Sequence, residues 1–157
     1  MSDKGKKIAV IGVGNILLTD EGLGVRAVEM LKRKGVPKNV DLFDAGTSLH
    51  LIMGQFEKFD KLIILDAVKA QGQPGTIYRF SLEELEQGKI EEKGLMLSLH
   101  ELDVPKAIAL EKLVSKLPEE IIFIGMEPES LDAGMELSET IKNKMPEFIR
   151  LIEQEWS

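Results

Sequence analysis

The sequence contains no cysteine, and this absence excludes several kinds of chemistry. Without thiols the chain has no disulfide framework, no thiolate nucleophile, and no zinc or iron–sulfur site of the cysteine type. Histidine is scarce too, since only His50 and His100 are present. Any function that requires an imidazole therefore depends on one of these two residues.

Long apolar runs and clusters of basic residues are also lacking. The stretch before Ile8 is short and charged, and the apolar run that follows is interrupted by Gly12 and Gly14. We therefore expect no signal peptide, no membrane insertion and a cytoplasmic protein. The net charge of −7 argues against nucleic-acid binding, which requires clustered Lys and Arg side chains.

Aromatic residues make up only 5% of the chain, whereas 43% of the residues are hydrophobic. This composition predicts a core of aliphatic side chains. A chain of 157 residues is long enough to bury such a core within one domain. We therefore predict a single domain that spans residues 1–157.

Apolar runs of strand length alternate with helical patterns along the chain. Strands are predicted at residues 7–13, 40–43, 61–66, 76–80 and 120–125, and helices at 22–34, 49–56, 104–116 and 138–155. The run at 76–80 alternates, which is typical of an antiparallel edge strand. These elements predict an α/β fold, a three-layer sandwich with a mostly parallel sheet of about five strands and helices on both faces.

Two local patterns refine this prediction. Residues 81–84 have the sequence of a capping box, which predicts a short helix after Ser81. The predicted helix at 104–116 carries an apolar stripe at helical spacing. The stripe consists of Ala107, Leu110, Leu113 and Val114.

The glycines after the first predicted strand resemble the start of a dinucleotide-binding loop. The third glycine of that motif is missing, because Leu17 occupies its position. Asp20 and Glu21 would also repel a pyrophosphate. A nucleotide cofactor is therefore disfavoured, and Gly12 and Gly14 are interpreted as parts of a tight turn.

Carboxylates follow three of the predicted strands. Asp20 and Glu21 follow the first strand, Asp44 the second and Asp66 the third. Each of them alone is explained by the preference of Asp for turns and helix caps. Together they lie at the edge where the carboxyl ends of parallel strands meet. Converging carboxylates raise one another's pKa values, and a bound metal ion removes this repulsion.

The two histidines differ in their expected surroundings. His50 lies within a predicted helix and is expected to be a partly buried structural residue, whereas His100 precedes a helix in a loop that can present a metal ligand. One histidine and two carboxylates with open positions form a metal site of the catalytic type. A Ser98–His100–Asp triad is disfavoured, because residues two positions apart rarely face each other.

The stretch from Ile11 to Val25 closely resembles the N-terminal signature of the hydrogenase maturation endopeptidases, which process the large subunit of nickel–iron hydrogenases. Four further segments are similar to motifs of this family: Asp44–Thr47, Leu62–Ala67, Ser98–His100 and Gly125–Ser130. Ala45 departs from the glycine that is usual in the first of these segments. The likeness extends over nearly the whole chain.

This resemblance implies an endopeptidase whose partner is the immature large subunit of a [NiFe] hydrogenase. The enzyme would bind nickel that the precursor already carries and remove a short C-terminal extension. Glu21, Asp66 and His100 would contact the nickel. Asp20 would support or cap this site, and Asp44 with Gly46 and Thr47 would form a loop that positions the substrate.

Two mechanisms and one different function remain open at this stage. Nickel could polarise the scissile carbonyl or lower the pKa of a bound water. Alternatively, nickel could only orient the substrate, while Asp44 or a water that it holds transfers the proton. The different function is that of a non-catalytic chaperone with the same fold, which binds nickel or the precursor.

Overall fold

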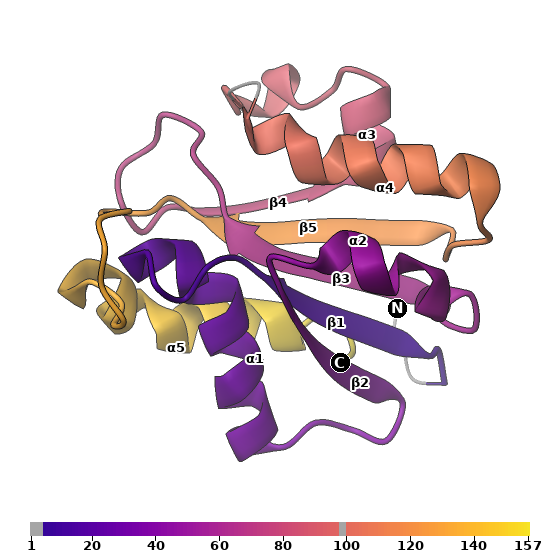
Figure 1. Cartoon of the computed structure of the whole chain (residues 1–157), viewed down its shortest axis with the longest axis horizontal. Coiled ribbons are helices and arrows are strands. Elements are labelled where there is room, and N and C mark those ends of the chain that lie inside the picture. Colours follow the sequence, from indigo (N-terminus) through magenta and orange to yellow (C-terminus); the bar gives the residue numbers. More distant parts are fainter. Residues whose placement is uncertain (1–4, 98–99) are drawn as a thin grey trace.

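The structure is a computed structural model that describes residues 5–97 and 100–157, and His100 by its backbone alone. Five strands form one sheet in the order β2-β1-β3-β5-β4 (Figure 1). The strands are β1 (Ile8–Val13), β2 (Val40–Gly46), β3 (Lys61–Ala67), β4 (Ile77–Ser81) and β5 (Glu120–Met126). All neighbouring strands are parallel except β4 and β5, which are antiparallel. The predicted sheet and its antiparallel edge strand are confirmed.

Helices cover both faces of the sheet. One face carries α1 (Leu23–Lys34) and α5 (Glu139–Glu153); the other carries α2 (Leu49–Ile52), α3 (Leu82–Glu86) and α4 (Asp103–Val114) (Figure 1). Short 3₁₀ turns complete the chain: η1 (Thr19–Gly22), η2 (Met53–Phe56), η3 (Glu91–Lys93) and η4 (His100–Leu102). The predicted three-layer sandwich is therefore confirmed.

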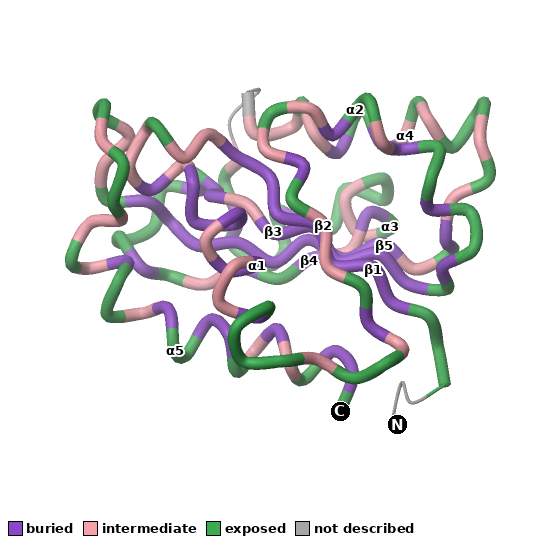
Figure 2. Tube along the Cα trace, turned by 60° about the horizontal axis from the view of Figure 1, so that its bottom comes forward, coloured by how far each residue is buried: buried purple, intermediate pink, exposed green. Residues whose placement is uncertain are grey.

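The central strands are buried along almost their whole length (Figure 2). In β1, Ala9 and Ile11 pack on the side of α2 and α4, whereas Ile8 and Val10 pack on the side of α1 and α5. Because both faces are covered, the sequence of β1 is continuously apolar and does not alternate. The two faces together form a core that is mostly aliphatic, as the composition predicts, and that also buries aromatic side chains such as Phe56 and Phe148.

Two predicted boundaries require correction. The second strand was predicted to end at Phe43, with a loop from Asp44, but β2 continues to Gly46 because Asp44 pairs in register with Gly12 of β1. The parallel pairing outweighs the turn preference of these residues. The predicted helix at 49–56 is divided into α2 and η2. The capping box is confirmed, since the Ser81 hydroxyl accepts a hydrogen bond from the backbone N–H of Glu84.

The apolar stripe of α4 does not enter the core. Leu110, Leu113 and Val114 are largely exposed, and the buried residues of the helix are Pro105 and Ile108. Apolar spacing identifies a helix with one apolar face, but it does not distinguish a face that packs on the core from one that remains at the surface. Among the described helices, none combines the length and apolarity that crossing a membrane requires.

A buried ion network lies at the start of β3, at the opposite end of this strand from Asp66. The ammonium group of Lys61 lies 3.0 Å from a carboxylate oxygen of Glu155, and both side chains are buried. Arg79 donates two hydrogen bonds to the same carboxylate, of 2.8 and 3.0 Å. Burial alone would raise the pKa of Glu155, but the hydrogen bonds from Arg79 and Lys61 bring it below its ordinary value.

We predict that Glu155→Ala destabilises the fold strongly. The substitution removes a carboxylate from a buried lysine, and breaking a buried ion pair in this way lowers the free energy of unfolding by about 3–5 kcal/mol. Urea denaturation measures this difference. The control is Glu147→Ala, which breaks an exposed pair with Lys144 and should change the free energy by less than about 1 kcal/mol.

The same network predicts a pH dependence. Because the folded-state pKa of Glu155 lies below the unfolded value, its stabilising effect is fully present above the unfolded pKa and is lost as the pH falls through the folded pKa. The stability difference between the wild type and Glu155→Ala should therefore shrink on acidification. A difference that is constant between neutral and acidic pH would contradict this assignment.

Candidate functional site

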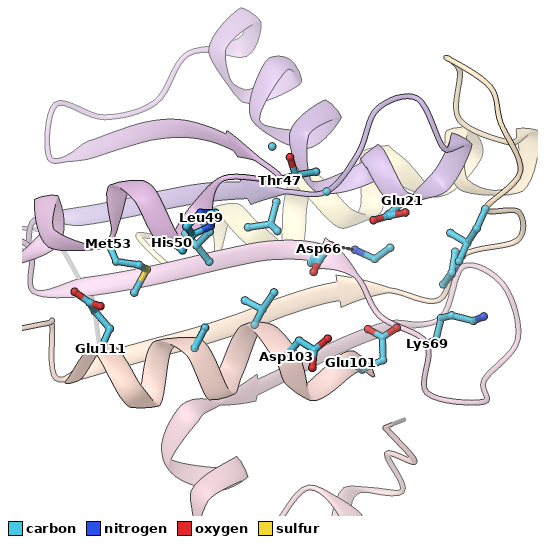
Figure 3. A pocket seen from close by; sticks show the side chains of 18 residues that line it. Glu21, Thr47, Leu49, His50, Met53, Asp66, Lys69, Glu101, Asp103 and Glu111 are labelled. Carbon is cyan, nitrogen blue, oxygen red and sulfur yellow. Dashed lines mark hydrogen bonds between the residues drawn. The ribbon is translucent and has the colours of Figure 1, made fainter. Parts of the chain in front are cut away.

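A cavity of about 430 Å³ lies at the carboxyl edge of the parallel strands (Figure 3). Its walls come from the ends of β1, β2 and β3, from α2 and α4, and from residues 128 and 131 after β5. The chain passes from β1 to β2 through α1 on one face, and from β2 to β3 through α2 on the other face. The carboxyl edge between β1 and β3 is therefore a topological switch point, where α/β proteins bind their ligands.

Two of the predicted nickel-contacting residues meet in this cavity. Glu21 belongs to η1, which follows β1, and Asp66 lies at the end of the central strand β3. Figure 3 shows both carboxylates pointing into the same space. Strand pairing fixes Asp66, because its register with Gly125 continues to the end of β3.

Electrostatics in the cavity disfavour a charged Asp66. Burial is the largest cause that raises the pKa of Asp66 well above its ordinary value, and the neighbouring carboxylates of Glu101 and Glu21 raise it further. The backbone N–H of Ala67 opposes this effect through a hydrogen bond of 2.8 Å to Asp66 Oδ1. A cation placed between these carboxylates would favour their ionised forms.

Gly14 allows η1 to approach the end of β3. Its φ of +131° is rarely adopted by other residues, and a Cβ atom there would lie 1.9 Å from the carbonyl oxygen of Glu21. The same atom would lie 3.6 Å from Asp66 Oδ1. The glycine after β1 therefore brings the backbone of Glu21 close to the carboxylate of Asp66.

Asp20 is fully buried and supports the neighbouring Glu21. Its carboxylate accepts hydrogen bonds of 2.8–3.0 Å from three backbone N–H groups, those of Glu129, Ser130 and Ser138. The hydroxyl of Ser138 donates a fourth, of 2.8 Å. Asp20 thus connects η1 to the segment 127–138 through hydrogen bonds. Both of its carboxylate oxygens accept hydrogen bonds from these donors.

Thr19 reinforces this attachment. Its φ of 50° lies in the left-handed region, which is unfavourable for a β-branched residue. Two hydrogen bonds hold it there: its N–H donates to the carbonyl of Gly134 at 2.9 Å, and its hydroxyl donates to the carbonyl of Asp132 at 2.5 Å. The backbone that precedes Glu21 in η1 is therefore fixed by the late segment 127–138.

The predicted substrate loop is only partly in the cavity wall. Gly46 and Thr47 line the cavity. Asp44 has an exposed side chain in β2 and is not one of the described residues that line the cavity. Its role in proton transfer stays a prediction.

The histidines depart from expectation in different ways. His50 was predicted to be partly buried, and this is wrong, because the short helix α2 leaves its side chain exposed at the wall of the cavity (Figure 3). His100 begins η4, but its side chain and the whole of Ser98 lie outside the described residues. The roles predicted for them are therefore not tested. Within the described residues, no group of three or more Asp, Glu or His side chains is arranged to hold a metal ion alone.

The cavity wall contains three carboxylates that the sequence analysis did not identify as site residues. Glu101, Asp103 and Glu111 come from η4 and α4. These residues lie on a helix and on the turn before it, and not at the end of a strand, where the carboxylates predicted from the sequence lie. The available signal was the spacing of Asp103, Ala107 and Glu111, which places them on one side of a helix.

Comparisons with known proteins agree with this architecture. The family model HycI, hydrogenase maturation protease, matches residues 25–155. The Hydrogenase 2 maturation protease of Escherichia coli is 36% identical over 141 residues, which cover 87% of this chain and 82% of the relative. The hydrogenase expression/formation protein HupD of Thiocapsa roseopersicina is 35% identical over 92% of this chain, which spans 65% of that relative's length.

A solved structure also matches. The hydrogenase maturating endopeptidase HybD from E. coli superposes with a TM-score of 0.77 at 31% sequence identity. The superposition covers 93% of this chain and 89% of that chain. The likeness therefore includes nearly all of the chain.

Proposed function

The chain belongs to the hydrogenase maturation protease family, and on this premise we propose that it is an endopeptidase that removes the C-terminal extension of a nickel-loaded [NiFe] hydrogenase large-subunit precursor. The observation that supports this proposal is the meeting of Glu21 and Asp66 in one cavity at the switch point of the sheet. One relative is named as a hydrogenase maturation protease and the other as a hydrogenase expression/formation protein, which agrees with a precursor as the substrate.

In this proposal nickel enters as part of the substrate. Glu21, Asp66 and the imidazole of His100 contact it, and carboxylate oxygens and imidazole nitrogens are suitable ligands for a divalent nickel ion. The raised pKa of Asp66 supports a cation at this place, because the positive charge would offset the repulsion from Glu21 and Glu101. An empty precursor would lack the ion that joins it to the enzyme.

The bond is broken by hydrolysis. Bound nickel supplies a Lewis acid, which polarises the scissile carbonyl or lowers the pKa of a bound water. Glu21 and Asp66 hold the precursor's metal centre against the end of β3, and the backbone of Gly46 and Thr47 forms the adjoining wall along which the peptide lies. If nickel serves only to orient the substrate, Asp44 or a water that it holds accepts the proton of the attacking water; Asp44 precedes Gly46 in β2 and does not itself line the cavity.

Turnover of a purified precursor tests the proposal. Catalytic amounts of the protein should shorten the nickel-loaded precursor by one fixed C-terminal piece, which mass spectrometry identifies. The nickel-free precursor should remain intact, because it lacks the group that Glu21 and Asp66 bind. Stoichiometric binding without shortening would instead identify a maturation chaperone, and equal cleavage of both precursors would contradict recognition through nickel.

A further inference from the structure

Helix α4 presents an apolar surface that nothing in the described fold covers. The exposed fractions are 66% for Leu110 and 81% for both Leu113 and Val114. With Ala107 these residues form what we call the α4 face. Isolated apolar residues at a surface need no explanation, but a group on one helix marks a site of protein contact.

The α4 face is continuous with the cavity. Val104 and Ala107, from the first two turns of α4, line the cavity together with Glu111 from the next turn. Val114 follows Ala107 by seven positions, which is about two turns, and therefore lies on the same side of the helix. A chain that leaves the cavity along this side of α4 therefore meets the α4 face.

The opposite wall of the cavity is made by α2 and the turn after it. Figures 1 and 2 both place α2 and α4 on the same side of the sheet. Leu49 and Met53 contribute apolar surface to the cavity, and His50 lies beside them (Figure 3). The side chains of Leu49, Met53 and Ala107 form the apolar walls of a groove that an extended peptide can occupy.

The α4 side of this groove carries negative charge. Asp103 and Glu111 line it, and Glu111 also accepts a hydrogen bond of 2.6 Å from the hydroxyl of Ser115. Among the described residues that line the cavity, Lys69 is the one that carries a permanent positive charge. A basic side chain can therefore rest its aliphatic stem on the apolar wall and place its charged end near Asp103 and Glu111.

We propose that the hydrogenase precursor docks along α4: an apolar patch of its folded body covers the α4 face, and its C-terminal segment, which carries a basic side chain, continues into the groove past Glu111. This inference rests on the proposed function, which requires a segment of a large protein to reach Asp66. An open groove between two helices admits such a segment, and the α4 face accounts for contact with the body from which it extends.

Docking and chemistry can be separated by kinetics. The double variant Leu110→Ser with Val114→Ser removes apolar surface that lies outside the core, so the fold should be retained. With the nickel-loaded precursor, KM should rise about tenfold or more and kcat should stay within about twofold, which is the pattern for lost uniform binding. A peptide with only the precursor's C-terminal segment should bind both proteins equally. The control is Met96→Ser, which removes exposed apolar surface (56%) that does not line this cavity and should leave KM unchanged.

Charge reversal tests the second half of the proposal. Glu111→Lys should weaken binding of the precursor about tenfold, and changing the basic residue of the precursor's segment to Glu should restore it, because like charges then become opposite charges. The control is Glu119→Lys, an exposed residue outside this cavity. Unchanged affinity of Glu111→Lys for the precursor would overturn the assignment of the basic side chain. So would a precursor with the basic-to-Glu change that binds Glu119→Lys as tightly as it binds Glu111→Lys.

Measurements of both binding and cleavage distinguish failure of this inference from failure of the proposed function. If the wild type cleaves the precursor and the double variant has the same KM, the docking surface is wrong and the protease remains. If the wild type binds but never cleaves, and the double variant binds more weakly, the docking surface stands and the protease is wrong. A change from dimer to monomer in the double variant during ultracentrifugation would assign the α4 face to a second copy of the chain and overturn the proposal.

Discussion

Asp66→Asn is expected to lower kcat/KM for the nickel-loaded precursor by about 100-fold or more without weakening the fold. The loss should be this large because even groups that only orient a metal ligand contribute about 10- to 100-fold to activity or metal affinity. Asp66 shares the cavity with Glu21, so Glu21→Gln should have an effect of the same order. Cleavage rates measured over a range of precursor concentrations give both values.

The stability of the Asp66 variant separates a role in function from a role in folding. Burial and the nearby carboxylates raise the folded-state pKa of Asp66 above its unfolded value, so ionisation of this group opposes folding at neutral pH. Asparagine removes that charge, and the melting temperature should be equal to or above that of the wild type. Asp41→Asn, at an exposed position of β2, is the control and should retain full activity. Full activity in Asp66→Asn would refute the assignment of the site.

Asp20→Ala is expected to damage both stability and activity. The substitution leaves three backbone N–H groups and the Ser138 hydroxyl without their buried acceptor. Because these four donors are only partly buried, each loss should lie near the lower end of the range of roughly 1–3 kcal/mol, and together they should lower the free energy of unfolding by about 4 kcal/mol. Activity should fall in the fraction that remains folded, because Glu21 is the next residue in η1.

Hydrogen exchange localises this effect. In Asp20→Ala the amides of Glu129, Ser130 and Ser138 should exchange faster, because the carboxylate is their hydrogen-bond acceptor. The control is Asp132→Ala in the same segment. Its exposed side chain is removed, while its carbonyl still accepts the bond from Thr19. If protection of the three amides is unchanged in Asp20→Ala, the attachment of η1 to this segment is not the stabilising contact described above.

The sheet could be predicted from the sequence because its central strands are short, mostly apolar runs. In β3, four consecutive aliphatic residues precede Asp66, and this pattern identified both a buried strand and one end of the cavity. The end of β2 could not be predicted, since Asp44 and Gly46 prefer turns and only the pairing with β1 keeps them in the strand. Tertiary contacts decided this boundary, and local preference did not.

The site could be predicted only in part, for a similar reason. The ends of parallel strands pointed to four carboxylates, Asp20, Glu21, Asp44 and Asp66, and the family resemblance selected Glu21 and Asp66 among them. Which residues of α4 line the cavity depends on how that helix is rotated over the sheet. Its apolar stripe suggests one side as the packed side, but the stripe is exposed and a different side packs on the core. Glu101 and Glu111 could therefore be placed in the cavity only once the packing of α4 was known.

The bonds between Asp20 and Ser138 also affect when the site can form during synthesis. Glu21 and Asp66 are made early, but the groups that fix η1 come from residues 129–138, and β5 must insert between β3 and β4 before that segment is in place. A nascent chain that has emerged only as far as β4 thus carries the acidic residues without the scaffold that aligns them. We therefore expect Glu21 and Asp66 to become aligned only after residues 129–138 have been synthesised and have packed against η1.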